Sequence, residues 1–160
     1  MLFCSDKQKT SLETLLRRYQ LQVNWLDNNA AIPGSWFGEP EAGLIKNQVY
    51  VRPDTPVHSA LHESCHYVCM DAQRREHLDT NAAGDYEEEN GVCFLQILLA
   101  DFLPDMGQPR MMQDMDDWGY TFRLGSAKRW FNEDAEDTRD WLIKHELIDR
   151  HNNPTWKLRQ

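Results

Sequence analysis

Two histidines and a glutamate lie close together in the segment His62-Glu63-Ser64-Cys65-His66. Residues four apart stand one above the other on an α-helix, so His62 and His66 can direct imidazole nitrogens at one metal ion. Glu63 follows the first histidine and would lie beside that ion, where a carboxylate can take a proton from a metal-bound water. The spacing therefore predicts a metal site with a general base next to it.

The same residues allow a plainer interpretation, in which His62 is a helix-surface histidine and Glu63 a solvated charge. The neighbouring sequence favours the metal site, because it predicts a helix with suitable faces. Thr55 can cap that helix with its hydroxyl, and Pro56 suits the first helical position. At 100° per residue, the face opposite His62 is mostly apolar and is expected to be buried. It consists of Val57, Ala60, Leu61, Ser64, Tyr67 and Val68.

Composition limits the classes of protein to which the chain can belong. Its 160 residues, with 41% hydrophobic side chains and six tryptophans, predict a single folded domain over residues 1–160. The net charge of −9 argues against a nucleic-acid partner, because phosphate binding needs a basic face. No apolar run approaches the ~18 residues needed to cross a membrane, and the N-terminus lacks the features of a signal peptide. We therefore expect a cytoplasmic protein with no membrane contact; nothing in the sequence sets an oligomeric state.

The four cysteines are Cys4, Cys65, Cys69 and Cys93. Cys65 and Cys69 fall one turn apart on the predicted helix, which suits free thiols better than a disulfide framework. A closed structural zinc site made from these two, Cys93 and a histidine is an alternative, although the chain has no C-x-x-C motif. Buried thiols that only pack are the commoner outcome.

Periodicity and turn residues predict an α+β fold in which a β-hairpin comes directly before the histidine-bearing helix. The hairpin strands flank Asn47, a turn residue. The elements expected before that helix are a helix over about 11–20 that starts at a capping box, Thr10-Ser-Leu-Glu13, a short strand over 21–25, and the hairpin strands 42–46 and 48–52.

A second strong helix is predicted after a polar loop over 71–85. Asp85 would cap it, and it would run to Leu103, just before Pro104. It is apolar on nearly every side after Val92, so we expect it to be central. The expected C-terminal elements are a short acidic helix within 105–117, an extended connection or short strand over 120–124, a helix from Ser126 to about Leu147 with Thr138 facing outward, and a peripheral tail over 151–160.

The H-E-x-x-H pair, the preceding hairpin and the acidic residues on the following helix resemble the minimal gluzincins. These zincin-type zinc metallopeptidases include the catalytic domains of ImmA/IrrE-type regulatory proteases. The resemblance covers about residues 42–103, with 105–150 as a helical extension. It implies a zincin-like fold, with a small antiparallel sheet on the H-E-x-x-H helix and an edge strand that binds an extended peptide. It also implies hydrolysis of a peptide or protein substrate; the alternative is a zincin-shaped metal-binding regulatory protein without turnover.

In that family two histidines and a downstream glutamate hold Zn²⁺, and the motif glutamate is the general base. Carried over, the resemblance makes His62 and His66 zinc ligands and Glu63 the base. The third ligand would come from the Glu87–Glu89 run, although acids at a helix start are also common because of the helix dipole. We choose Glu89, since it shares a face with small and polar residues, over Glu88, which continues an apolar stripe. The polar face contains Cys93, Gln96 and Ala100, and the candidate oxyanion stabilisers are Tyr86, Tyr120 and His77.

Overall fold

The computed structural model describes residues 1–160 and has an α+β fold, as the sequence predicts. Seven α-helices, three 3-10 helices and three strands make up the chain. In order they are η1 (Asp6–Gln8), α1 (Lys9–Arg17), β1 (Gln22–Trp25), β2 (Gly43–Ile45), β3 (Gln48–Val51), α2 (Val57–Cys69), α3 (Ala72–Glu76), α4 (Tyr86–Leu99), η2 (Ala100–Phe102), α5 (Gly107–Trp118), η3 (Arg123–Gly125), α6 (Ala127–Glu133) and α7 (Glu136–Lys144).

The three strands form a small mixed sheet in the order β1-β3-β2. β2 and β3 are antiparallel, with Leu44 opposite Val49, and form the predicted hairpin around Asn47. β1 runs parallel to β3, so the expectation of a purely antiparallel sheet is wrong. A parallel pair needs a long crossover, which the segment 26–42 and β2 together provide.

The hairpin does not have the free edge strand, available to an extended peptide, that the resemblance to gluzincins implies. β3, the strand directly before α2, lies in the middle of the sheet, and β2 is an edge strand. The outward backbone groups of β2 at Leu44 are already bonded: its N–H donates to Gly34 O (3.2 Å) and its carbonyl accepts from Thr80 N (3.3 Å). An extended peptide cannot pair with β2 at Leu44 unless these two segments move.

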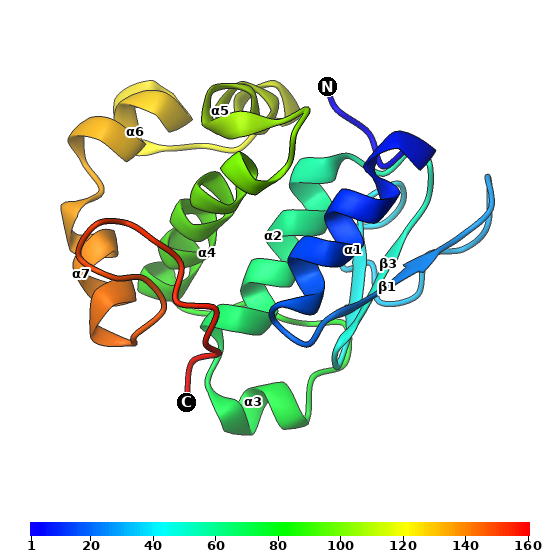
Figure 1. The fold of residues 1–160 in the computed structure, drawn as a ribbon, viewed down its shortest axis with the longest axis horizontal. Helices are drawn as coiled ribbons and strands as arrows, with labels where there is room; N and C mark the ends of the chain where they lie inside the picture. The colour runs from blue at the N-terminus through cyan, green and yellow to red at the C-terminus, as the bar shows by residue number, and fades with distance from the viewer.

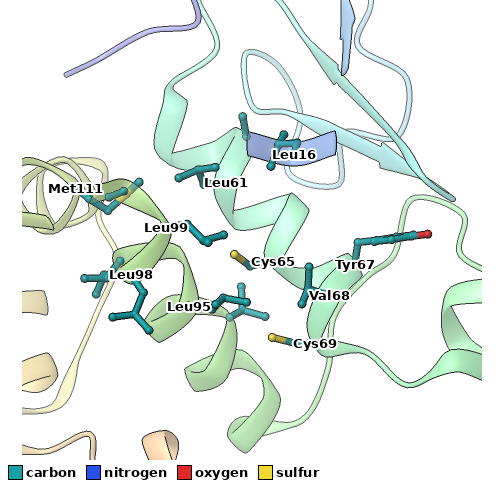
Figure 2. Close-up of a cluster of buried hydrophobic side chains, with 14 of the residues drawn as sticks. Leu16, Leu61, Cys65, Tyr67, Val68, Cys69, Leu95, Leu98, Leu99 and Met111 are labelled. Carbon is teal, nitrogen blue, oxygen red and sulfur yellow. The ribbon is translucent and has the colours of Figure 1, made fainter. Parts of the chain in front are cut away.

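Helices α2 and α4 lie side by side at the centre of the molecule, with α1 on the other side of α2 (Figure 1). The whole predicted back face of α2 is buried, as expected from its periodicity. Figure 2 shows Cys65 and Cys69 of α2 among Leu95 and Leu99 of α4. All four cysteines are unpaired, which confirms the expectation of free thiols.

Two predicted caps are wrong, because their side chains make other hydrogen bonds, one within a local turn and one to a residue of β1. α2 begins at Val57 with Pro56 at the cap position and no capping side chain. The Thr55 hydroxyl instead accepts a hydrogen bond from Arg52 N (2.9 Å) and closes the turn that joins β3 to α2. At the N-terminus, α1 already begins at Lys9, so Thr10 lies inside it, and Glu13 accepts from Trp25 Nε1 (2.6 Å). Asp85 does cap α4, accepting from Glu88 N (2.9 Å).

The C-terminal third departs from the prediction at its last helix. α5 ends at Trp118, with Gly119 in the left-handed conformation, and residues 120–122 form an extended connection rather than a strand. The helix expected from Ser126 to Leu147 is two helices, α6 and α7, separated at Asp134, which pairs with Arg123 (2.8 Å). Thr138 is buried rather than outward-facing, because α7 packs against α4.

The tail is not peripheral, contrary to the expectation. Arg159 N donates to the carbonyl of Val68 in α2 (3.0 Å), and its guanidinium donates to Cys69 O (3.1 Å) and to the Glu88 carboxylate (3.3 Å). The Trp156 ring packs against Tyr19, with ring centroids 5.2 Å apart. The tail therefore covers the C-terminal end of α2. No helix in the chain is both long enough and apolar enough to span a membrane.

Candidate metal centre

The two central helices bring His62, His66 and Glu89 together. His62 and His66 lie one turn apart on the same face of α2, His66 buried and His62 partly buried, and Glu89 comes from the first turn of α4. The two histidine Nε2 atoms are 3.1 Å apart, and Glu89 Oε2 lies 3.6 Å from His66 Nε2. One potential ligand atom from each residue lies within 4.8 Å of the other two.

These separations suit a tetrahedral ion. Two ligand atoms about 2.0–2.1 Å from one zinc ion at the tetrahedral angle lie roughly 3.3 Å apart. The two observed contacts, 3.1 Å and 3.6 Å, bracket that value. No cysteine and no second carboxylate joins the group, so three protein atoms converge and a four-coordinate ion would keep one position open. An open fourth position is typical of catalytic zinc sites, whereas structural sites are closed by four protein ligands.

Protonation also suits metal binding at the histidines. Burial lowers the pKa of His62 and, more strongly, that of His66, where His62 and Arg74 add to the effect. Both rings are therefore neutral near neutral pH, and a neutral imidazole can offer a nitrogen lone pair to a metal. His66 Nδ1 is buried without a hydrogen-bond partner, so the polar contacts of this ring are those that Nε2 makes with His62 and Glu89.

Gln96 of α4 orients the other histidine. Its Oε1 lies 2.8 Å from His62 Nδ1, while its Nε2 donates to the carbonyl of His58 (3.1 Å). The second bond fixes which end of the amide faces His62, so Nδ1 carries the proton and Nε2 is left free to bind a metal. Gln96 lies on the same polar face of α4 as Glu89, as the sequence predicts, and in the structure its side chain contacts His62.

Replacing Gln96 by leucine is expected to weaken zinc binding about 10- to 100-fold, because the acceptor that orients His62 is lost. Competition with a fluorescent zinc chelator measures this affinity. Gln113→Leu makes the same chemical change on the exposed face of α5 and should leave the affinity unchanged. Equal affinities for Gln96→Leu and the unaltered chain would show that His62 does not need this contact.

Glu89 and Glu88 have different environments. Glu89 Oε1 accepts from Gly84 N (3.1 Å), so its other oxygen is directed at the histidines. The Glu88 carboxylate is buried and pairs with Arg74 (2.7 Å) and Arg159 (3.3 Å), and it is not part of the group. The structure therefore brings Glu89, and not Glu88, to His62 and His66.

Glu63 lies beside the histidines in a buried position. Burial, with smaller contributions from Glu41 and Glu89, raises the pKa of Glu63 to about 8. A bound cation would lower this pKa, because positive charge favours the carboxylate form. Burial and a neighbouring cation would therefore shift the Glu63 pKa in opposite directions.

The cluster opens into two adjoining hollows that share Phe37, His62, Glu63 and Glu89. The larger has a volume of about 380 Å³ and the smaller about 170 Å³. The larger is completed by Glu41, Ser59, Cys93, Trp118, Gly119 and Tyr120, and the smaller by Trp36, His66, Thr80, Ala82 and Ala83. An extended ligand that lay across both hollows would run past the three converging atoms of His62, His66 and Glu89.

The remaining candidates lie in different places. Tyr120 lines the larger hollow, and its hydroxyl is 3.1 Å from His58 Nδ1. Tyr86 and His77 are exposed and line neither hollow. Sequence reasoning missed Phe37, Glu41 and Trp118 as lining residues, because they come from separate loop and helix-end positions. Only the exposed aromatic pair in the Gly- and Pro-rich loop over 32–43 could have suggested this surface.

Comparison of the chain with protein-family models, with curated proteins and with solved structures gave no match.

Proposed function

We propose that the chain is a zinc-dependent peptidase with a zincin-like, gluzincin-type centre. The observation that carries this proposal is the convergence of His62, His66 and Glu89 at the two adjoining hollows, which together we call the cleft, with Glu63 beside them. Two nitrogens and one carboxylate oxygen form a ligand set that zinc peptidases use. The open fourth position favours a catalytic centre over a structural one.

In the proposed mechanism, His62, His66 and Glu89 would hold Zn²⁺. When bound, the ion supplies Lewis acidity, lowering the pKa of water and polarising a peptide carbonyl. Glu63 accepts the proton of the attacking water and passes it to the leaving amine. Gln96 keeps the His62 ring in its ligating orientation. Tyr120 is the one oxyanion candidate that lines the cleft, and its hydroxyl can donate to the developing charge.

The substrate in this proposal is a peptide or protein segment. A segment lying across the two hollows would place one side chain in each and a peptide bond near His62 and Glu63. Because β2 is bonded along its outer edge at Leu44, we do not assign backbone pairing to that strand. The four unpaired cysteines suit a reducing compartment, and a cytoplasmic location is part of the proposal.

A library of quenched fluorescent peptides tests the proposal. The zinc-loaded chain should cleave some members, treatment with a chelator should abolish cleavage, and added zinc should restore it. Metal content measured by mass spectrometry on the same sample should give about one zinc per chain. Zinc bound without any hydrolysis would favour the zincin-shaped binding protein, and failure to bind supplied zinc would overturn both functions.

A further inference from the structure

The larger hollow combines aromatic walls with one carboxylate that neither the ligand set nor the base uses. Phe37, Trp118 and Tyr120 supply the rings, and Glu41 supplies the carboxylate. Its volume, about 380 Å³, is large enough to accept a long side chain. No lysine or arginine lines this hollow.

Glu41 is held in place from three directions. Its Oε1 accepts from Trp118 Nε1 (2.7 Å) at the end of α5. Its backbone carbonyl accepts from the Ser35 hydroxyl (3.2 Å). The next residue, Ala42, donates its N–H to Ser59 Oγ (2.9 Å), which belongs to α2 one turn before His62. The carboxylate is therefore a fixed feature of the cleft wall.

The chemistry of this wall indicates what it can accept. A carboxylate beside aromatic faces attracts a cation, through charge pairing at the oxygen and through the negative ring faces. Trp118 donates to Oε1 of Glu41, and Oε2 forms no other bond in the protein, so one oxygen can accept from a ligand. An acidic side chain in the same hollow would face Glu41 and Glu63 without a basic residue to offset their charge.

We propose that this hollow selects a basic side chain, arginine or lysine, next to the scissile bond of the substrate, with Glu41 as the specificity-determining residue. The inference rests on the proposed peptidase function and adds the substrate class. The long aliphatic stem of such a side chain would pack between the rings, and its charged end would reach Glu41.

The test uses binding, which does not depend on turnover. Short peptide hydroxamates bind zinc directly, and a matched set carries arginine, lysine, norleucine or glutamate at the position next to the hydroxamate. Calorimetry on the zinc-loaded chain should show the arginine and lysine compounds binding roughly 10- to 100-fold more tightly than norleucine, with glutamate weakest.

Glu41→Gln isolates the charge, because glutamine keeps an acceptor oxygen for Trp118. In this variant, we expect the preference for arginine and lysine over norleucine to disappear while norleucine binds as before. Glu87→Gln removes an equal charge two residues from Glu89, on the exposed side of α4, and should keep the preference.

The outcomes separate the two proposals. Tighter binding of norleucine than of arginine, or a basic preference that survives Glu41→Gln, would overturn the inference and leave the metal centre standing. Absence of binding by every hydroxamate to the zinc-loaded chain would overturn the peptidase proposal and the inference together.

Discussion

Replacing Glu63 by glutamine is expected to lower kcat by roughly 10²- to 10⁴-fold while zinc remains bound at one ion per chain. Glutamine has nearly the same shape as glutamate but cannot accept the proton of the attacking water. Glu63 lies beside the ligand atoms and outside the converging group, so its loss should leave coordination intact. Steady-state kinetics on a cleaved peptide and metal analysis of the same preparation measure the two quantities.

Glu76→Gln is a suitable control, since it removes one carboxylate from the exposed end of α3 and should not change kcat. Two results would contradict the assignment of Glu63. Loss of zinc in Glu63→Gln would mean that Glu63 ligates the ion, and unchanged turnover would mean that another group is the base.

Replacing His66 or Glu89 by alanine is expected to remove zinc from the chain. Each change removes one of only three side chains whose potential ligand atoms converge. Loss of a ligand should cost more than the roughly 10- to 100-fold that follows loss of an orienting partner. Metal content after dialysis, and affinity by chelator competition, should fall in both variants, and peptide hydrolysis should fall with them.

His77→Ala is the matched control for the histidine, because His77 is exposed and lies outside the cluster. Circular dichroism should show that all variants keep their helices. If Glu89→Ala retained zinc while His66→Ala lost it, the third ligand would have to come from elsewhere. Glu88 could serve as that ligand only by breaking its ion pairs with Arg74 and Arg159. Glu89→Ala therefore also tests the prediction that Glu88 is not a ligand.

The sequence alone determined the features that depend on local periodicity. The apolar spacing in α2 and α4 predicts two buried helices, because residues three and four apart share one helical face. The four-residue spacing places His62 above His66, and turn chemistry at Asn47 predicts the hairpin. The same periodicity separates Glu89 from Glu88, although their roles in metal binding stay predictions.

Tertiary structure decided everything that depends on which segments meet. Glu13 has the type and spacing of a capping-box residue, yet its carboxylate accepts a hydrogen bond from Trp25 Nε1 of β1 (2.6 Å). Likewise, the tail is polar enough to be solvated, but Arg159 finds acceptors at the end of α2 and at Glu88. The hydrogen-bond partner of each of these side chains lies far away in the sequence, so the secondary-structure propensities of single residues cannot predict it.

The cleft shows this division most clearly. His62 and Glu63 are neighbours in sequence, so their proximity needs no fold. Glu41, Trp118 and Glu89 are far apart along the chain and meet because α2 packs against α4 and because Trp118, at the end of α5, bonds to Glu41. The sequence alone therefore predicts that His62, His66 and Glu63 lie close together. The position of Glu89 beside them, and the residues that line the two hollows, depend on how the helices and loops pack.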